Sequence, residues 1–303
     1  MEDKDKTITN SQSFALASKV KDYFQLIKFT LTFLVVFSSV ASYLLTPGVS
    51  FGNNLPQVLL LFVAGILITG AANAINQTWE RNTDAIMRRT ASRPVASHRM
   101  SVKEGYIFAG VSAIIGIFLI GYFFNLNSAL LSLFSLLLYG FVYTPLKRVN
   151  SIAVLVGAFP GALPCLIGWV AGTNEFSAGG WILFSIQFLW QFPHFWAIAW
   201  LAHEDYTKAG FKLLPSNAGP TKFTALQTIM YSLLMVPIGF LPFFYHISGV
   251  VSMWIVFACN MAMVLLSINL FRKMDKRSAR MVMFGAYFYL MIVFLSLNAD
   301  KLS

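Results

Sequence analysis

Long apolar stretches separated by short polar segments dominate the pattern of residues along the chain. A helix needs about 20 mostly apolar residues to cross a bilayer core of roughly 30 Å. The sequence contains nine stretches of about this length, so we predict nine transmembrane helices. They span approximately Phe29–Thr46, Gln57–Trp79, Gly105–Phe124, Asn127–Leu146, Ser151–Thr173, Gly180–Ala202, Phe223–Tyr245, Gly249–Phe271 and Met281–Asn298.

The composition supports an integral membrane protein built only from helices. Of the 303 residues, 57% are apolar and 11% are charged, whereas soluble domains have about 25% charged residues. This excludes a soluble globule, a disordered chain and a disulfide-stapled secreted domain. Because the connections are short, we predict a cytoplasmic N-terminal arm over residues 1–28 and a single nine-helix transmembrane domain over residues 29–303.

The basic residues alternate between the two sides of the membrane. The N-terminal arm holds five Lys and Arg, and the loops after helices 2, 4, 6 and 8 hold six, two, three and five. Only Lys301 falls on the other side. The positive-inside rule therefore predicts a cytoplasmic N-terminus. The net charge of +10 then reflects loops facing anionic lipid, and we expect the bilayer and no nucleic acid as a partner.

The N-terminal arm also carries information about localisation. It contains three acids within its first five residues and no early apolar run. These features argue against a cleaved signal peptide and against a basic transit peptide. We expect a multi-pass protein of a bacterial plasma membrane.

A polar stripe runs along helix 2 to its cytoplasmic end. At 100° per residue, the side chains of Asn73, Asn76, Glu80 and Asp84 fall within a sector of about 80° if the helix continues that far. An arginine-rich loop follows directly; its arginines include Arg88, Arg89, Arg93 and Arg99.

This combination of residue types can hold Mg²⁺ and a diphosphate together. Mg²⁺ prefers oxygen ligands, commonly one or two carboxylates with phosphate oxygens and water, and arginine grips the remaining phosphate oxygens. An equally good interpretation at this point is an interfacial helix end that forms ion pairs with its own loop.

Helix 6 carries a second polar stripe that reaches the same membrane face. Gln187, Gln191, His194 and Asp205 share one side of the helix, and the stripe ends in the adjacent acids Glu204 and Asp205. Pro193 could kink this helix, which makes the phase of Asp205 approximate. Polar groups inside a membrane usually face the protein interior or a water-filled cavity. Two such stripes favour one cavity that opens to the cytoplasm, while His194 alone could equally be a histidine hydrogen-bonded within the bundle.

Two further segments could contribute to this face of the protein. Tyr143, Lys147 and Arg148 close helix 4 and could extend an anion-binding surface; a solvated basic loop explains the two charges equally well. Helix 5 contains glycines and prolines that permit close packing and a bend. They are Gly157, Pro160, Gly161 and Pro164.

The sequence resembles the UbiA superfamily of intramembrane prenyltransferases, and within it the branch that modifies haem. The resemblance is carried by NAINQTWERNTDAIMRRTASRP, YTPLKR and PHFWAIAWLAHEDYTKAGFKLLP. It implies nine helices around a central cavity, with Mg²⁺ and diphosphate at its cytoplasmic mouth. It also implies transfer of a farnesyl group from farnesyl diphosphate to a vinyl group of haem B, with water added, to give haem O. A haem A synthase would be the partner that acts next.

Matched position by position, the resemblance assigns roles to residues in both stripes. Asn76, Glu80 and Asp84 match the first metal–diphosphate motif, and Arg89 and Arg93 match its extension. Asn73 and His194 match positions typical of the haem-modifying branch. We therefore expect catalysis to involve Asn73, Asn76, Glu80, Asp84, His194 and Asp205, and substrate binding to involve Arg89, Arg93, Tyr143, Lys147, Arg148 and Gln191.

The sequence departs from the superfamily in helix 6. Many members have a second aspartate-rich motif of the DxxxD kind there, whereas this chain has only Glu204 and Asp205, which we take as the second set of candidate metal ligands. Two other functions stay open at this point. One is prenyl transfer to an aromatic or quinone-precursor acceptor, and the other is secondary transport of an organic anion. The absence of an evident repeat and the odd helix count disfavour a transporter.

Overall fold

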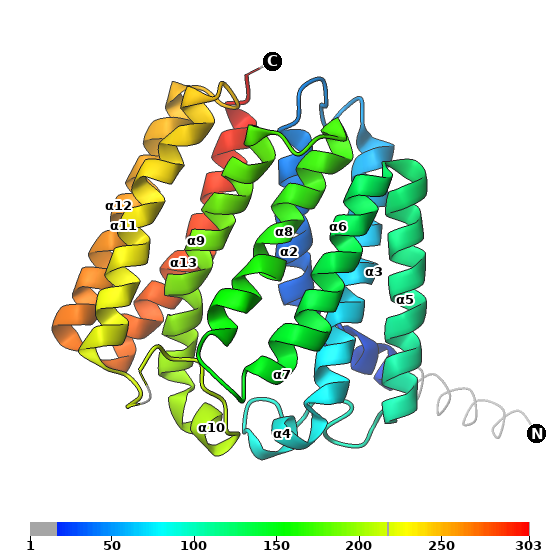
Figure 1. The fold of residues 1–303 in the computed structure, drawn as a ribbon, viewed down its shortest axis with the longest axis vertical. Helices are drawn as coiled ribbons and strands as arrows, with labels where there is room; N and C mark the ends of the chain where they lie inside the picture. Colours follow the sequence, from blue (N-terminus) through cyan, green and yellow to red (C-terminus); the bar gives the residue numbers. More distant parts are fainter. Residues whose placement is uncertain (1–16, 217, 303) are drawn as a thin grey trace, which may run out of the picture.

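Residues 17–216 and 218–302 are described by a computed structural model in which every regular element is a helix. The long helices run side by side (Figure 1). The elements are α2 (Phe29–Leu44), α3 (Leu55–Trp79), α4 (Arg81–Ile86), α5 (Val102–Phe123), α6 (Leu126–Leu137), the π-helix η1 (Leu138–Tyr143), α7 (Thr144–Leu146), α8 (Ala153–Thr173), α9 (Ala178–Leu201), α10 (His203–Lys208), α11 (Lys222–Phe244), α12 (Val250–Lys273) and α13 (Lys276–Ala299).

Each of the nine predicted segments overlaps one long helix or, for Asn127–Leu146, the continuous run α6–η1–α7. In the described part of the chain, seven of these are long and apolar enough to cross a membrane. Ala17–Leu26 and α2, whose axes differ by 53°, make an eighth if this bent pair is a single span. The all-helical, multi-pass membrane fold is thus confirmed, and crossing by the ninth segment, α9, stays a prediction. So do the central cavity and the cytoplasmic N-terminus.

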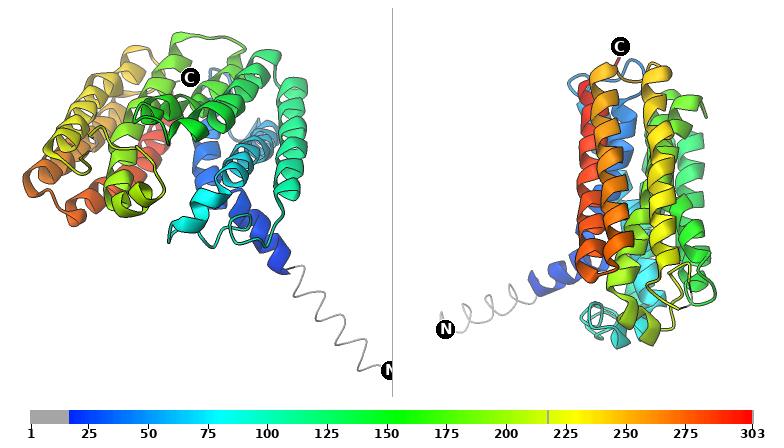
Figure 2. Two further views of the ribbon diagram at one scale, coloured as in Figure 1. Left: turned by 60° about the horizontal axis from the view of Figure 1, so that its bottom comes forward. Right: turned by 90° about the vertical axis from the view of Figure 1, so that its left-hand side faces the viewer.

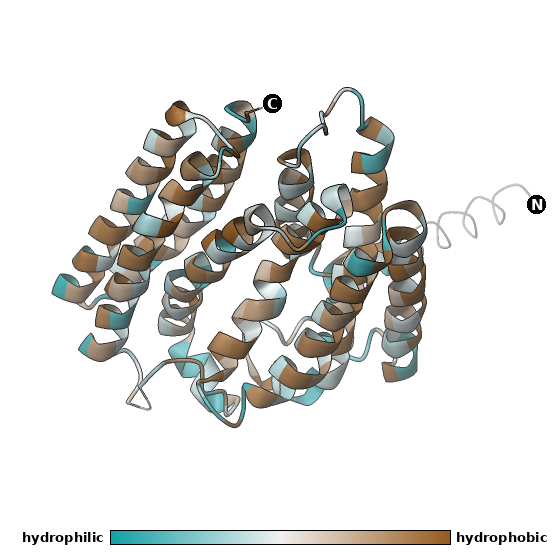
Figure 3. Cartoon of the chain, turned by 45° about the horizontal axis from the view of Figure 1, so that its top comes forward, coloured by the Kyte–Doolittle hydropathy of each residue, from teal (hydrophilic) through white to brown (hydrophobic). Residues whose placement is uncertain are grey.

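The bundle is packed around two large apolar cores. One lies among α2, α3, α5 and α6, and the other among α9, α11, α12 and α13. Helices α2, α8 and α9 pack against one another in series and connect the two parts, as the views in Figure 2 show. Apolar residues predominate along the long helices (Figure 3), and many large ones are exposed, as expected for surfaces that face lipid.

Local sequence signals explain where several helices begin. The side chains of Ser101, Asn125, Thr221 and Asp275 accept hydrogen bonds from the first-turn amides of α5, α6, α11 and α13. Such caps satisfy amides that have no partner within the helix.

The glycines and prolines of α8 allow the close packing that the sequence predicts. A side chain at Gly157 would collide with the ring of Tyr143, and one at Gly161 would collide with Gln191. Pro164 has no amide to donate to the carbonyl of Pro160, and Ser135 of α6 donates to it instead at 3.3 Å. Helix α8 therefore lies tightly between α6–η1 and α9.

The short helices α4, α7 and α10 lie together at the end of the bundle opposite the C-terminus (Figure 1). Met87, Ala209 and Phe211 form a small apolar cluster there, with Tyr206 and Leu213 packed against it. This contact joins the loop after α4 to the segment after α10, so the cytoplasmic ends predicted for helices 2 and 6 are adjacent.

Candidate active site

The site begins at a break in the first helix. Lys28 separates Ala17–Leu26 from α2 and has a left-handed backbone conformation, with φ 51° and ψ 58°. The break leaves backbone carbonyls without helical partners, and side chains of α3 donate to them. Gln77 donates to the carbonyls of Gln25 and Leu26 at 2.8 and 2.7 Å, and Asn73 donates to that of Ile27 at 3.2 Å.

Asn73 therefore holds the break in the first helix in place through several hydrogen bonds. Its side-chain amide also donates to Thr32 Oγ1 at 3.1 Å, and its oxygen accepts from the Tyr139 hydroxyl at 3.5 Å. These bonds fix the break next to α3. They place the ammonium group of Lys28 2.8 Å from Asn76 Oδ1, so Lys28 joins the polar stripe of helix 2.

The stripe itself continues across the junction between α3 and α4. Helix α3 ends at Trp79 and Glu80 departs from helical geometry. The amides of Glu80 and Asp84 nevertheless donate to the carbonyls four residues earlier, at 2.9 and 2.7 Å. The helical phase is therefore kept, and Asn76 donates to Glu80 Oε2 at 2.8 Å and to Thr144 Oγ1 at 3.2 Å.

Two buried ion pairs neutralise the carboxylates of this stripe. Glu80 Oε1 lies 2.6 Å from Lys147 Nζ, and Asp84 Oδ2 lies 2.6 Å from Arg93. Glu80 and Asp84 are 5% and 0% exposed. Lys28 is linked to Glu80 through Asn76, which accepts from the Lys28 ammonium and donates to the Glu80 carboxylate. Three segments far apart in sequence therefore meet in one charged cluster, which we call the α3–α4 cluster: Lys28, Asn76, Glu80, Asp84, Arg93 and Lys147.

The oxygen atoms of this cluster suit a hard divalent cation. Asp84 Oδ1 is buried and has no hydrogen-bond partner among the residues that the structure describes. Within the same residues, Glu80 Oε1 contacts the Lys147 ammonium but receives no hydrogen bond of good geometry. Within residues 17–216 and 218–302, no three His, Cys, Asp or Glu side chains form a metal-binding group. Two carboxylates and an amide match Mg²⁺, which takes few protein ligands and keeps phosphate oxygens and water.

Aromatic rings lie against the basic side chains in and beside the cluster. Lys147 Nζ lies 4.9 Å from the ring centroid of Tyr143 and 5.3 Å from that of Phe211. The amide of Lys212 donates to the Lys147 carbonyl at 2.8 Å. Arg89, which is exposed, reaches the hydroxyl of Tyr206 on α10 at 3.4 Å.

His194 lies in an aromatic pocket between α9 and α13. Its ring stacks on Trp190 with centroids 4.9 Å apart, and meets Tyr287 edge-on at 4.8 Å. The side chain is 6% exposed, and its Nδ1 atom has no hydrogen-bond partner among the described residues. The ring also lies close to the main chain of Met283 on α13, so a role of His194 toward substrate stays a prediction.

Several other candidates lie outside the α3–α4 cluster. Gln191 and Gln187 donate to backbone carbonyls of α8, at Ala158 and Gly161, and serve helix packing. Glu204 is exposed and forms an ion pair with Lys276 at 2.9 Å. The Asp205 side chain has no hydrogen bond or ion pair with any described residue, and the same holds for the exposed Arg148.

Sequence reasoning missed residues that the cluster and its surroundings contain. Lys28 was counted only as one of the positive charges of the N-terminal arm, although a lysine directly before the first apolar stretch was a usable signal. Gln77 was also missed, as were Phe211 and Tyr287. Nothing in the local sequence places these aromatic rings beside Lys147 and His194.

Two measurable grooves of the molecule lie away from the cluster. One of about 480 Å³ is lined by residues that include Tyr23, Glu104 and Phe108. The other, of about 510 Å³, lies between α12 and α13. We identify the α3–α4 cluster as the candidate site from its buried carboxylates and cations.

The sequence matches the UbiA prenyltransferase family over residues 34–295, and the chain belongs to this family. Among its relatives is the protoheme IX farnesyltransferase of Cytophaga hutchinsonii, which is 44% identical over 288 residues, covering 95% of this chain and 100% of that protein. The protoheme IX farnesyltransferase of Flavobacterium psychrophilum is 39% identical over 292 residues, covering 94% and 96%.

Solved structures with the same fold come from more distant proteins. A digeranylgeranylglyceryl phosphate synthase in membranes superposes with a TM-score of 0.76 at 20% identity, covering 93% of this chain and 98% of that one. A UbiA homolog from Archaeoglobus fulgidus, bound to GPP and Mg²⁺, gives a TM-score of 0.66 at 15% identity, covering 91% and 99%. These likenesses confirm the expected UbiA-like helical fold.

Proposed function

We propose that this protein transfers the farnesyl group of farnesyl diphosphate to a vinyl group of haem B, with addition of water, and so produces haem O. The observation that carries the proposal is the α3–α4 cluster, in which buried carboxylates and cations meet inside a UbiA-family bundle. The acceptor follows from relatives that are protoheme IX farnesyltransferases and align along nearly the whole chain.

The cluster binds the diphosphate end of the donor. Lys28, Arg93 and Lys147 supply three positive charges, and Arg89 and Tyr143 border them. Charge-assisted hydrogen bonds from lysine and arginine are the strongest that a protein offers to phosphate oxygens. Before substrate binds, Glu80 and Asp84 neutralise two of these cations, which lets the charges persist in a buried place.

The same carboxylates, with Asn76, would hold Mg²⁺, which when bound neutralises the diphosphate and makes it a better leaving group. Asp84 is the strongest candidate ligand because its Oδ1 atom is buried without a hydrogen-bond donor. Glu204 and Asp205, the second set of ligands expected from the sequence, are weaker candidates, because Glu204 is exposed and paired with Lys276 at the end of α9–α10.

Bond breaking and bond making then follow from the charges of the protein. The C1–O bond of farnesyl diphosphate breaks, and the diphosphate leaves with both electrons toward Lys28, Arg93 and Lys147. The allylic cation is attacked by the vinyl group of haem B, which forms the new C–C bond. Water bonds to the resulting cation beside the porphyrin and releases one proton.

His194 acts on the acceptor side of the reaction. Its unpartnered Nδ1 atom and stacked ring fit either ligation of haem iron or orientation of the attacking water. Asn73 acts as a positioning residue, because it holds the break that places Lys28.

The cellular setting completes the proposal. The site opens to the cytoplasmic side of a bacterial plasma membrane. Residues 29–303 form one transmembrane domain, the arm at 1–28 adds Lys28 to its site, and a haem A synthase uses the product. The alternation of basic residues and the bacterial relatives support this arrangement.

The test is a mass spectrum of the haem extracted after purified protein is incubated with haem B, farnesyl diphosphate and Mg²⁺. We expect a product heavier by one farnesyl group and a hydroxyl, and no such product with EDTA. Unmodified haem from protein that elutes as a folded species would contradict the proposed acceptor, and aromatic acceptors would then be assayed. Turnover of one of those would retain prenyl transfer, whereas no turnover would favour anion transport.

A further inference from the structure

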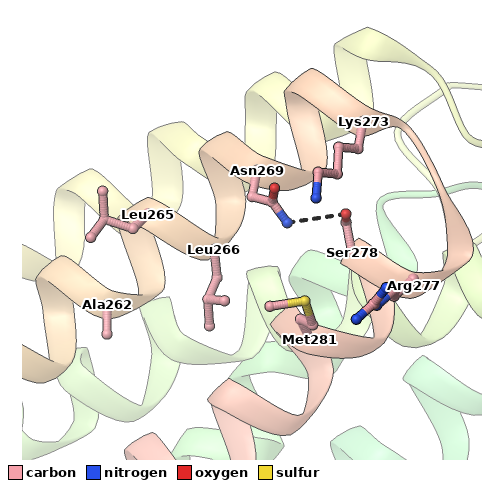
Figure 4. Close-up of a pocket in the computed structure, with 8 residues that line it drawn as sticks. All are labelled: Ala262, Leu265, Leu266, Asn269, Lys273, Arg277, Ser278 and Met281. Atoms are coloured by element: carbon pink, nitrogen blue, oxygen red, sulfur yellow. Dashed lines mark hydrogen bonds between the residues drawn. The ribbon is translucent and has the colours of Figure 1, made fainter.

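A groove of about 510 Å³ follows the hairpin of α12 and α13 (Figure 4). On α12, Ala262, Leu265, Leu266, Asn269 and Lys273 line it, and on α13, Arg277, Ser278 and Met281. The α12 residues follow helical spacing and so form one face of the helix. The groove is apolar over most of its length and polar at the end near the turn.

The apolar part of the groove is open to the surface. Leu265 is 62% exposed and Met281 is 44% exposed. Farther from the turn the two helices approach closely, since a side chain at Gly285 would collide with Leu266 at 2.5 Å. The groove is thus closed behind by the helix contact and open along its side, where a membrane protein faces lipid.

The polar end carries an excess of positive charge. The turn and its flanks contain Arg272, Lys273, Lys276, Arg277 and Arg280. In the described part of the chain only Lys276 forms an ion pair, with Glu204. The acid within the turn, Asp275, accepts hydrogen bonds at the start of α13, from the Ser278 amide at 2.7 Å. Among the described residues, neither Lys273 nor Arg277, the two cations that line the groove, has a carboxylate within 4 Å, and the nearby Asp275 acts on both only at longer range.

The depth of this end in the membrane is consistent with a headgroup. The ion pair between Lys276 and Glu204 ties the turn to α10, and α10 lies at the same end of the bundle as α4 (Figure 1). The cations therefore lie where the helices leave the apolar layer, and the apolar lining extends from them along the helices. Inside the polar end, the Asn269 amide donates to Ser278 Oγ at 3.1 Å.

We infer that this groove binds one anionic phospholipid, with the phosphate between Lys273 and Arg277 and an acyl chain along Leu265, Leu266 and Met281. Both parts of the groove are needed for this occupant. Unpaired cations at a membrane surface attract anionic lipid. A free phosphate has no apolar part that could contact the apolar lining. The site is distinct from the α3–α4 cluster and does not depend on the proposed reaction.

The experiment measures lipid binding to the purified full-length protein by native mass spectrometry in a neutral detergent. Phosphatidylglycerol and phosphatidylcholine of identical chains are titrated separately, and the dissociation constant of the first bound lipid is determined. We expect phosphatidylglycerol to bind at least tenfold more tightly. Equal affinity of the two lipids would overturn the inference, and so would displacement of phosphatidylglycerol by inorganic diphosphate at similar concentration.

A matched pair of double variants locates the site. Lys273→Gln with Arg277→Gln removes the two lining cations, and Arg272→Gln with Arg280→Gln removes two cations of the same turn that do not line the groove. Because each of the two lining cations should contribute about fivefold through direct contact with the phosphate, we expect about 30-fold weaker phosphatidylglycerol binding in the first variant. The second should stay within about threefold of the parent, and equal weakening in both would contradict a discrete site. Leu265→Trp, which fills the groove and keeps all charges, should also weaken binding.

Discussion

The ends of α3 and α9 look alike in sequence but differ in the structure. Each helix carries a polar stripe that ends in acids at the same membrane face. At the end of α3 the acids are buried and ion-paired, as Glu80 and Asp84 are. At the end of α9, Glu204 is exposed and forms an ion pair with the exposed Lys276, and the glutamines of the stripe bind α8.

We take burial as the property that distinguishes the candidate catalytic carboxylates from the surface ones. A carboxylate removed from water must be compensated by a cation, a hydrogen bond or a metal ion. Such a group costs stability and persists where it has a function, whereas an exposed pair contributes little to stability. Burying the charges of the α3–α4 cluster costs folding free energy, and we therefore place the diphosphate chemistry there.

The largest effect is expected from Asp84→Asn. The substitution keeps the size of the side chain and removes the charge that pairs with Arg93 and supplies a buried oxygen. We expect prenyl transfer to fall by about 10²–10³-fold or more, with folding and membrane insertion retained. Steady-state turnover and size-exclusion profiles measure the two quantities. Full activity in this variant would remove the metal–diphosphate site as assigned.

A second large effect is expected from Lys147→Gln. It leaves Glu80 buried without its cation, so the free energy of unfolding should fall by about 3–5 kcal/mol. Adding Glu80→Gln should restore most of that stability but no activity, because the donor site lacks both charges. Thermal unfolding and turnover of the single and double variants distinguish the two contributions. Recovery of activity in the double variant would mean that Lys147 has only a structural role.

An intermediate effect is expected from His194→Ala. Because the histidine lies away from the α3–α4 cluster, haem turnover should fall by about 10²-fold while the affinity for farnesyl diphosphate stays near that of the parent. The Soret band of bound haem separates the two roles of His194, since only loss of an iron ligand should shift it. Unchanged haem kinetics would contradict both roles.

The smallest effect is expected from Glu204→Gln. Lys276 lowers the pKa of Glu204 through a hydrogen bond and its positive charge. The pair therefore forms above the usual pKa of glutamate and is lost as the pH falls through the lowered value. Because both groups are exposed, turnover at neutral pH should change by less than about twofold. A loss of turnover as large as that of Asp84→Asn would show that the ends of α3 and α9 contribute equally to catalysis.

Periodicity and charge predicted much of this arrangement. Apolar stretches of bilayer length gave the positions of the helices, and the phase of Asn76, Glu80 and Asp84 survives the junction at Glu80 because the hydrogen bonds continue across it. The contact of Lys28 could not be predicted in this way. It depends on one left-handed residue and on side chains of α3 that bind the carbonyls around it, and no helical period encodes that geometry.

The second helix end shows the other limit of sequence reasoning. The phase along α9–α10 correctly placed His194 and Gln191 in the interior. It gave no information on whether their partners are substrates or the backbone of α8. The partner of Gln191 depends on its close packing against Gly161, which is a property of α8 and α9 together.

The most direct test compares both helix ends in a single binding measurement. Isothermal titration calorimetry with a non-reactive farnesyl thiodiphosphate, with and without Mg²⁺, would be performed on the parent, Asp84→Asn and Glu204→Gln. We expect Mg²⁺-dependent binding to the parent and to Glu204→Gln, and a loss of the Mg²⁺-dependent part in Asp84→Asn. Unchanged Mg²⁺-dependent binding in Asp84→Asn, or its loss in Glu204→Gln alone, would contradict the central claim that the α3–α4 cluster holds the diphosphate.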